Sequence, residues 1–207
     1  MIPLINGPRP DLGATRPLDF IRHGSTKLNS EKGGDRIRGW ANIPLDDRGK
    51  AEAEKLGTKL CAGTKSDMLV SSDMDRARET AHIISRRCGL PMGGSTPVLR
   101  PWNLGHFQGK ESADVAPDII KYVHSPDTPV PGGESFNQFK NRFLSGLKEL
   151  LRKFPHRLAI ISHYRNERVL VALDKADWNG FDFKEFARRG SAPGSMVTFN
   201  IPATWLQ

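Results

Sequence analysis

Long hydrophobic runs are missing from this chain of 207 residues. No stretch of about 18 apolar residues occurs, which argues against a membrane-spanning helix. The stretch from Met1 to Pro10 also lacks a basic start followed by the long apolar core of a secretory signal. Its prolines favour an extended lead-in over residues 1–17.

Cysteine is scarce, with only Cys61 and Cys88 in the whole sequence. They form no C-x-x-C pair, and each falls at the end of a predicted helix. This pattern favours two buried free thiols over a disulfide, and it fits a cytoplasmic location.

Acidic residues are fewer than basic ones, 23 against 31, which leaves a net charge of +8. Such an excess attracts anionic substrates or nucleic acid, or it forms a solvated surface. The basic clusters, such as Arg152–Lys153 and Arg188–Arg189, have no interleaved aromatic residues. The sequence therefore favours a small anionic substrate over nucleic acid and leaves the oligomeric state open.

Signals for strands and helices alternate along the chain. Strands are expected at 18–21, 67–71, 157–162 and 195–201, and helices at 46–61, 77–88, 113–124, 135–151 and 166–173. The segment 91–133 otherwise reads as irregular. This order predicts a three-layer α/β sandwich with a largely parallel central sheet and helices on both faces, in one domain over residues 18–207.

Polar, reactive residues follow three of the predicted strands, at Arg22-His23, at Ser71 to Arg76 and at Ser162 to Arg165. Parallel strands bring their carboxyl ends to one edge of a sheet, so His23 and His163 should be neighbours. One imidazole can attack phosphorus while guanidinium groups hold the phosphoryl oxygens. The pattern predicts a phosphoryl-transfer site.

Five blocks in this order resemble the histidine phosphatase superfamily, in its phosphoglycerate mutase-like branch. They are Arg22-His23-Gly24-Ser25-Thr26 with Asn29, Arg38-Gly39-Trp40 through Gly49, Ser71 to Ala77 with Thr80-Ala81, Pro131 to Ser135, and Ser162-His163.

The resemblance implies a phosphomonoesterase that acts on a small phosphorylated substrate without a metal or other cofactor. His23 would become phosphohistidine, and Arg22, Arg76 and His163 would bind the phosphoryl group. Asn29 and Gly39 would contact the substrate.

The chain departs from the family where many members carry a glutamate that protonates the leaving group. It has Pro101 and Asn103 in that stretch, and an amide is no acid. Glu134 is the first candidate to replace that glutamate, although it could equally hold loop or helix amides. Glu111 is the second.

Arg165 is a second departure, because many relatives have smaller, more apolar residues after the histidine of the last block. This arginine could recognise a second phosphate or a carboxylate of the substrate. It could equally pair with a surface carboxylate.

Two alternative functions would use the same predicted phosphate site. One is a phosphoglycerate mutase-type phosphoryl transferase, and the other is a degenerate phosphate-binding protein with weak turnover. The compact chain and the missing glutamate speak against a mutase, and Pro101 favours the degenerate protein. A dinuclear metal hydrolase would need a cluster of carboxylate and histidine ligands that the sequence does not show.

Overall fold

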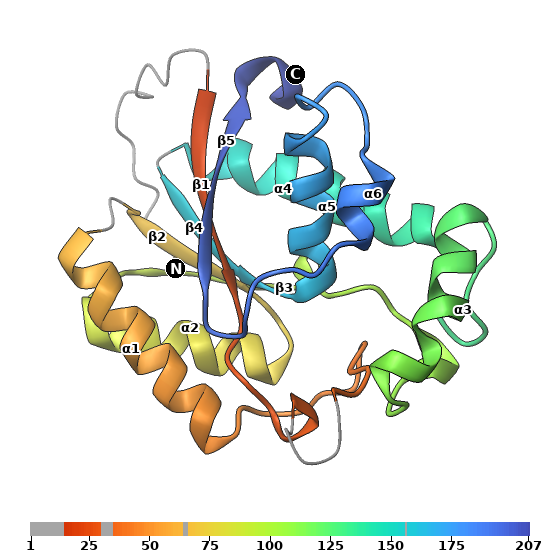
Figure 1. The fold of residues 1–207 in the computed structure, drawn as a ribbon. Helices are drawn as coiled ribbons and strands as arrows, with labels where there is room; N and C mark the ends of the chain where they lie inside the picture. Colours follow the sequence, from red (N-terminus) through yellow and green to blue (C-terminus); the bar gives the residue numbers. More distant parts are fainter. Residues whose placement is uncertain (1–14, 30–34, 64–65, 156) are drawn as a thin grey trace.

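A five-stranded sheet in the order β3-β2-β4-β1-β5 forms the centre of the molecule (Figure 1). The computed structural model describes residues 15–29, 35–63, 66–155 and 157–207. The strands are β1 (Thr15–Arg22), β2 (Met68–Ser72), β3 (Met92–Thr96), β4 (Leu158–Ser162) and β5 (Met196–Pro202). Only the pair β1–β5 is antiparallel, which confirms the largely parallel sheet.

The helices cover both faces of this sheet. They are α1 (Asp47–Gly63), α2 (Asp75–Cys88), α3 (Ser112–His124), α4 (Phe136–Lys153), α5 (Tyr164–Asp174) and α6 (Phe183–Ala187). Ile21 and Ile161 pack with α1 and α2, whereas Phe20 and Ile160 point to the opposite face, toward α4 and α5. This alternation confirms the three-layer sandwich (Figure 1). None of the described helices is long and apolar enough to cross a membrane.

The predicted helix ends have clear local causes. Asp46 accepts a hydrogen bond from the Gly49 N–H at 2.7 Å, at the start of α1. Ser135 and Gln138 form a capping box at the start of α4. Gly89 ends α2 with a φ of 66°, which a glycine adopts without strain.

Residues 15–17 were expected in the lead-in, but they form the first part of β1, paired with β5. Pro17 lacks an N–H, yet the strand continues through it. Residues 1–14, the rest of the predicted lead-in, lie outside the described residues.

Strand β3 contradicts the prediction that residues 91–133 are irregular apart from one helix at 113–124. It lies at the edge of the sheet and contains Gly93 and Gly94, which disfavour strands. A Cβ atom at Gly93 would lie 2.7 Å from the Met68 Sδ and 2.9 Å from a methyl group of Val70. Glycine is thus needed where the side chains of β2 fill the space.

The short helix α6 was not predicted either. Asp182 caps it by accepting hydrogen bonds from the N–H groups of Lys184 and Glu185, and Phe186 anchors it in the core. Five residues are too few to show a helical period.

The expectation of buried free thiols is wrong, because Cys61 and Cys88 form a disulfide. Their Cα atoms lie 5.1 Å apart where the ends of α1 and α2 meet, and Cys61 is exposed. Their sequence separation could not reveal this contact, which depends on the packing of the two helices.

Candidate active site

Adjacent parallel strands bring the two predicted histidines together. Arg22 on β1 lies beside Ser162 on β4, and the His23 N–H donates to the Ser162 carbonyl at 3.1 Å. The rings of His23 and His163 lie with centroids 5.1 Å apart, and each residue is 2% exposed. The histidines are neighbours, as the strand order predicts.

The His23 ring has one nitrogen fixed by the backbone. Its Nδ1 lies 2.7 Å from the Gly24 carbonyl oxygen, which can only accept, so Nδ1 carries the hydrogen. Burial, followed by the positive charges of Arg76, Arg38 and Arg22, lowers the pKa of His23 well below its usual value. The imidazole is therefore neutral near pH 7, with its lone pair on Nε2, the form that a nucleophile needs.

The imidazole of His163 is buried, while the backbone carbonyl of this residue accepts from the Glu167 N–H at 3.1 Å. Both ring nitrogens lack a partner among the described residues, although the residue precedes the first turn of α5. Burial and then Arg76 lower the pKa of this imidazole well below its usual value. Buried polar atoms are nearly always paired, so the ring is suited to bind a group that enters the site.

Arg22 and Arg76 approach the histidines from β1 and from the first turn of α2. They are 7% and 1% exposed, and their Nε atoms have no partner among the described residues. Burial lowers the pKa of Arg22 to about 10 and that of Arg76 to about 9, so both remain cations near pH 7. Two buried cations beside two neutral imidazoles favour a bound anion.

Gly39 acts on the site through its backbone. Its carbonyl accepts a hydrogen bond from Arg76 Nη2 at 2.9 Å, and the Ala41 carbonyl accepts from Nη1 at 2.8 Å. Gly39 has a φ of 46°, and a Cβ atom there would lie 2.8 Å from the Gln108 side chain. The residue thus shapes the loop that fixes the Arg76 guanidinium.

Arg38 is a further site residue, which the sequence reasoning passed over although it directly precedes Gly39. Its charge lowers the pKa of both His23 and His163. Its Nη1 donates to the Asp35 carboxylate at 2.8 Å, and its side chain is only 10% exposed. The signal that could have found it is an arginine inside a block already matched to the family.

Asn29 supports the loop that carries His23. Its side-chain oxygen accepts from the Thr26 N–H at 3.0 Å, and its amide donates to Asp35 at 2.8 Å. Because Asp35 also pairs with Arg38, Asn29 joins the histidine loop to a third cation of the site.

The histidine loop is packed tightly against α1 and α2. A Cβ atom at Gly24 would lie 2.4 Å from the Gly49 carbonyl oxygen, so only glycine fits. The Gly24 N–H donates to the Thr80 hydroxyl at 3.1 Å, and the Ser25 N–H donates to Glu52 at 2.8 Å. Both helices therefore hold the backbone next to His23.

The two candidate acids have other partners. Glu134 accepts from Arg142 Nε at 2.8 Å and Nη2 at 2.9 Å, and from the Asn103 N–H at 3.0 Å. Glu111 pairs with Arg36 at 2.9 Å and is 43% exposed. These contacts favour the loop-holding role for Glu134 over the role of proton donor.

Arg165 packs against aromatic rings. Its guanidinium carbon lies 5.4 Å from the centre of the Tyr164 ring and 5.6 Å from that of Phe186. It forms no ion pair with any residue that the structure describes. The surface carboxylate that could have paired with it is thus not found in the described part of the chain.

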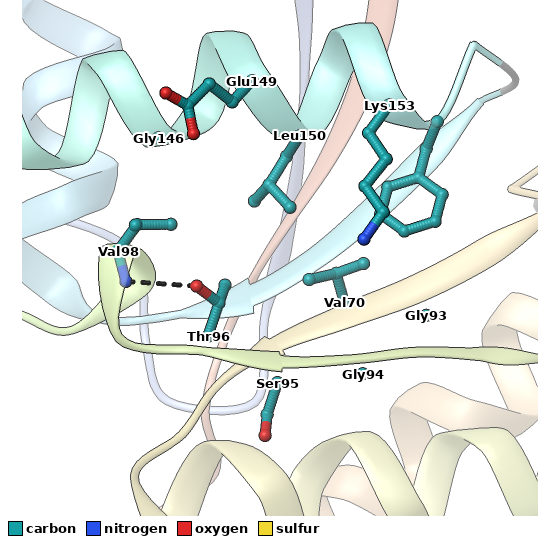
Figure 2. Close-up of a pocket in the computed structure, with 11 residues that line it drawn as sticks. Val70, Gly93, Gly94, Ser95, Thr96, Val98, Gly146, Glu149, Leu150 and Lys153 are labelled. Carbon is teal, nitrogen blue, oxygen red and sulfur yellow. Dashed lines mark hydrogen bonds between the residues drawn. The ribbon is translucent and has the colours of Figure 1, made fainter. Parts of the chain in front are cut away.

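Figure 2 shows a different hollow, between β3 and α4. Its volume is about 330 Å³, and Gly93, Gly146 and Lys153 are among its lining residues. It contains none of the site residues predicted from the sequence, so it is separate from the histidine pair.

Comparison with known protein families shows to which family the chain belongs. The family model of the histidine phosphatase superfamily (branch 1) matches residues 18–202. The chain belongs to this superfamily.

Two plant relatives are among the most similar curated proteins. Phosphoglycerate mutase-like protein 4 of Arabidopsis thaliana is 31% identical over 150 residues, covering 69% of this chain and 64% of the relative. Metal-independent phosphoserine phosphatase of the same plant is 30% identical over 151 residues, covering 70% of this chain and 62% of the relative. The chain thus spans a little under two thirds of the length of each.

The fold is also that of a solved phosphatase. Mycobacterial glucosyl-3-phosphoglycerate phosphatase, in complex with vanadate, superposes with a TM-score of 0.71 at 24% identity. The match covers 88% of this chain and 90% of that one. This likeness concerns the architecture.

Proposed function

We propose that this protein is a phosphomonoesterase that hydrolyses a small phosphorylated substrate through a phosphohistidine on His23. One observation carries the proposal: two buried neutral imidazoles, 5.1 Å apart, lie among the charges of Arg22, Arg38 and Arg76. A relative named for metal-independent phosphatase activity supports hydrolysis without a metal.

The reaction takes place in two displacements. The lone pair of the His23 Nε2 forms a bond to phosphorus while the ester P–O bond breaks, and the leaving oxygen departs with the bonding pair, as a phenolate or as an alkoxide that takes a proton from water. A water molecule then attacks phosphorus and releases a proton to the solvent, the electron pair of the N–P bond returns to Nε2, and inorganic phosphate leaves. Arg22, Arg76 and His163 stabilise the charge on the phosphoryl oxygens in both steps.

The neighbouring residues have supporting roles in this proposal. Asn29 and Gly39 hold the cations that contact the substrate, and Arg165 lies two residues after His163. The cytoplasmic location stays a prediction from the sequence, and the Cys61–Cys88 disulfide removes the cysteine pattern as its support.

The direct test measures the hydrolysis of p-nitrophenyl phosphate. In a second measurement the reaction is quenched rapidly, and the phosphoryl group bound to the protein is tested for stability in acid and in base. We expect turnover together with an acid-labile, base-stable phosphoryl group on the protein. Phosphate binding without turnover would instead identify the degenerate binding protein. Transfer of the phosphoryl group to a phosphoglycerate, faster than transfer to water, would identify a mutase. The mutase is the second candidate function because one relative is named phosphoglycerate mutase-like protein 4.

The pH dependence follows from the lowered pKa of His23. Protonation removes the attacking lone pair, and burial and the arginines shift that protonation well below the ordinary value of about 6.5. We expect kcat/KM to stay nearly constant from pH 8 down to about 6.5 and to fall only at lower pH. A rate that climbs steadily down to pH 4 would contradict a neutral nucleophile.

The rate should depend on the leaving group, because Pro101 and Asn103 replace the expected acid. Aryl phosphates, whose phenolates leave without a proton, should react roughly tenfold or more faster than alkyl phosphates. Parallel kcat/KM measurements on the two classes test this prediction.

Glu134→Gln separates the two roles of that carboxylate. The contacts with Arg142 and Asn103 predict a similar loss, of roughly tenfold or less, for aryl and alkyl substrates. A loss confined to alkyl substrates would instead make Glu134 the proton donor.

A further inference from the structure

The segment between α6 and β5 holds Arg22 by its backbone and by its side chain. The Arg22 N–H donates to the Ser195 carbonyl at 3.0 Å, and the Gly194 N–H donates to the Arg22 carbonyl at 3.1 Å. The guanidinium Nη1 donates to the Ser191 carbonyl. The position of this cation therefore depends on the position of the segment, which runs past the N-terminal end of α5 (Figure 1).

Glu167 in the first turn of α5 fixes Ser191. One carboxylate oxygen accepts from the Ser191 N–H at 2.9 Å, and the other accepts from the Ser191 hydroxyl. Glu167 is only 2% exposed. Burying a carboxylate is costly unless it is satisfied, and both of its oxygens are satisfied by the residue whose carbonyl binds Arg22.

Tyr164 contacts both the segment and the guanidinium. Its hydroxyl donates to the Arg188 carbonyl at 3.2 Å and accepts from the Gly190 N–H at 3.3 Å. The guanidinium carbon of Arg22 lies 5.0 Å from the centre of the Tyr164 ring, within cation–π range.

The electrostatic situation of Arg22 explains why it needs such support. Burial, and after it the positive charge of Arg38, lowers the pKa of Arg22, so the guanidinium is both desolvated and repelled by a neighbouring cation. The negative charges of Asp35 and Glu167 act in the opposite direction.

We propose that Glu167 and Tyr164 are positioning residues that fix the Arg22 guanidinium for the phosphoryl group, with Ser191 as the link. The inference rests on the proposed function in one respect, that Arg22 binds phosphoryl oxygens. Neither residue touches the reacting atoms in this arrangement.

A double-mutant cycle tests the link between Glu167 and Arg22. Binding of inorganic phosphate by calorimetry and kcat/KM for p-nitrophenyl phosphate are measured for Glu167→Gln, Arg22→Ala and the double variant. We expect Glu167→Gln to weaken both quantities roughly tenfold or more when Arg22 is present, and by less than about twofold in the Arg22→Ala background. Asp174→Asn, at the other end of α5, removes the same charge and should leave both nearly unchanged.

Further variants distinguish a specific effect on Arg22 from a general loss of folding. Ser191→Ala removes only one donor to Glu167 and should give a smaller loss in the same direction. Tyr164→Phe keeps the ring and should retain more phosphate binding than Tyr164→Leu. Equal losses from Glu167→Gln with and without Arg22 would overturn the proposal, as would no loss at all.

The two readouts distinguish this proposal from the proposed function. Coupled effects on phosphate binding in a protein without turnover would remove the phosphatase function and leave the positioning role intact. Normal turnover, with effects of Glu167→Gln and Arg22→Ala that simply add, would keep the phosphatase function and overturn the positioning role. A protein that neither binds phosphate nor hydrolyses the ester would overturn both.

Discussion

His23→Ala should abolish covalent phosphorylation and lower kcat by at least about a thousandfold, because it removes the nitrogen that attacks phosphorus in the proposed mechanism. The structure supplies the reason: His23 has its Nδ1 turned to the Gly24 carbonyl, so its Nε2 is free to react. Rapid-quench phosphoryl analysis and steady-state rates measure the two effects.

The control for this variant is an equivalent change outside the site. His82 lies on the exposed side of α2, and His82→Ala should keep both phosphorylation and turnover. Thermal unfolding should show that His23→Ala is folded. Near-normal activity of folded His23→Ala would exclude the phosphohistidine mechanism.

Arg76→Ala and His163→Ala should each lower kcat/KM by roughly a hundredfold or more, the effect of losing one preorganised donor to developing charge. Arg76 is held by two backbone carbonyls, and the buried ring nitrogens of His163 have no hydrogen-bond partner in the part of the chain that the structure describes. Most of each loss should appear in kcat, because these groups act most strongly in the transition state.

Arg76→Lys sharpens this prediction. A lysine keeps the charge but cannot donate to both the Gly39 and Ala41 carbonyls as the guanidinium does. We expect it to recover little of the activity lost in Arg76→Ala. Full recovery would mean that charge alone matters at this position.

The sequence predicts those parts of the site that depend on the order of the strands. Polar residues directly after apolar runs identified His23 and His163, and parallel pairing of β1 with β4 joins them. The helix starts at Asp46 and Ser135 were predictable because capping is a local interaction between residues three apart.

What the sequence left undecided depends on contacts between distant residues. The partner of Glu134 is Arg142 on α4, and nothing local ties these two side chains together. The pairing of Cys61 with Cys88 and the glycine-containing strand β3 are likewise set by neighbouring elements that pack against them. Glu167 was read as part of a helix, because its partner Ser191 lies in a distant segment.

The central position of β1 also determines when the protein can become active during its synthesis. Both neighbours of β1 in the sheet, β4 and β5, are synthesised late, beginning at Leu158 and Met196. A nascent chain that already contains His23 has no partner strand for β1, and closing so long a loop is slow and entropically costly. The His23 imidazole therefore acquires its surroundings only after β4 and β5 have emerged and paired with β1, and in refolding the return of activity should follow the pairing of β1 rather than the formation of helices.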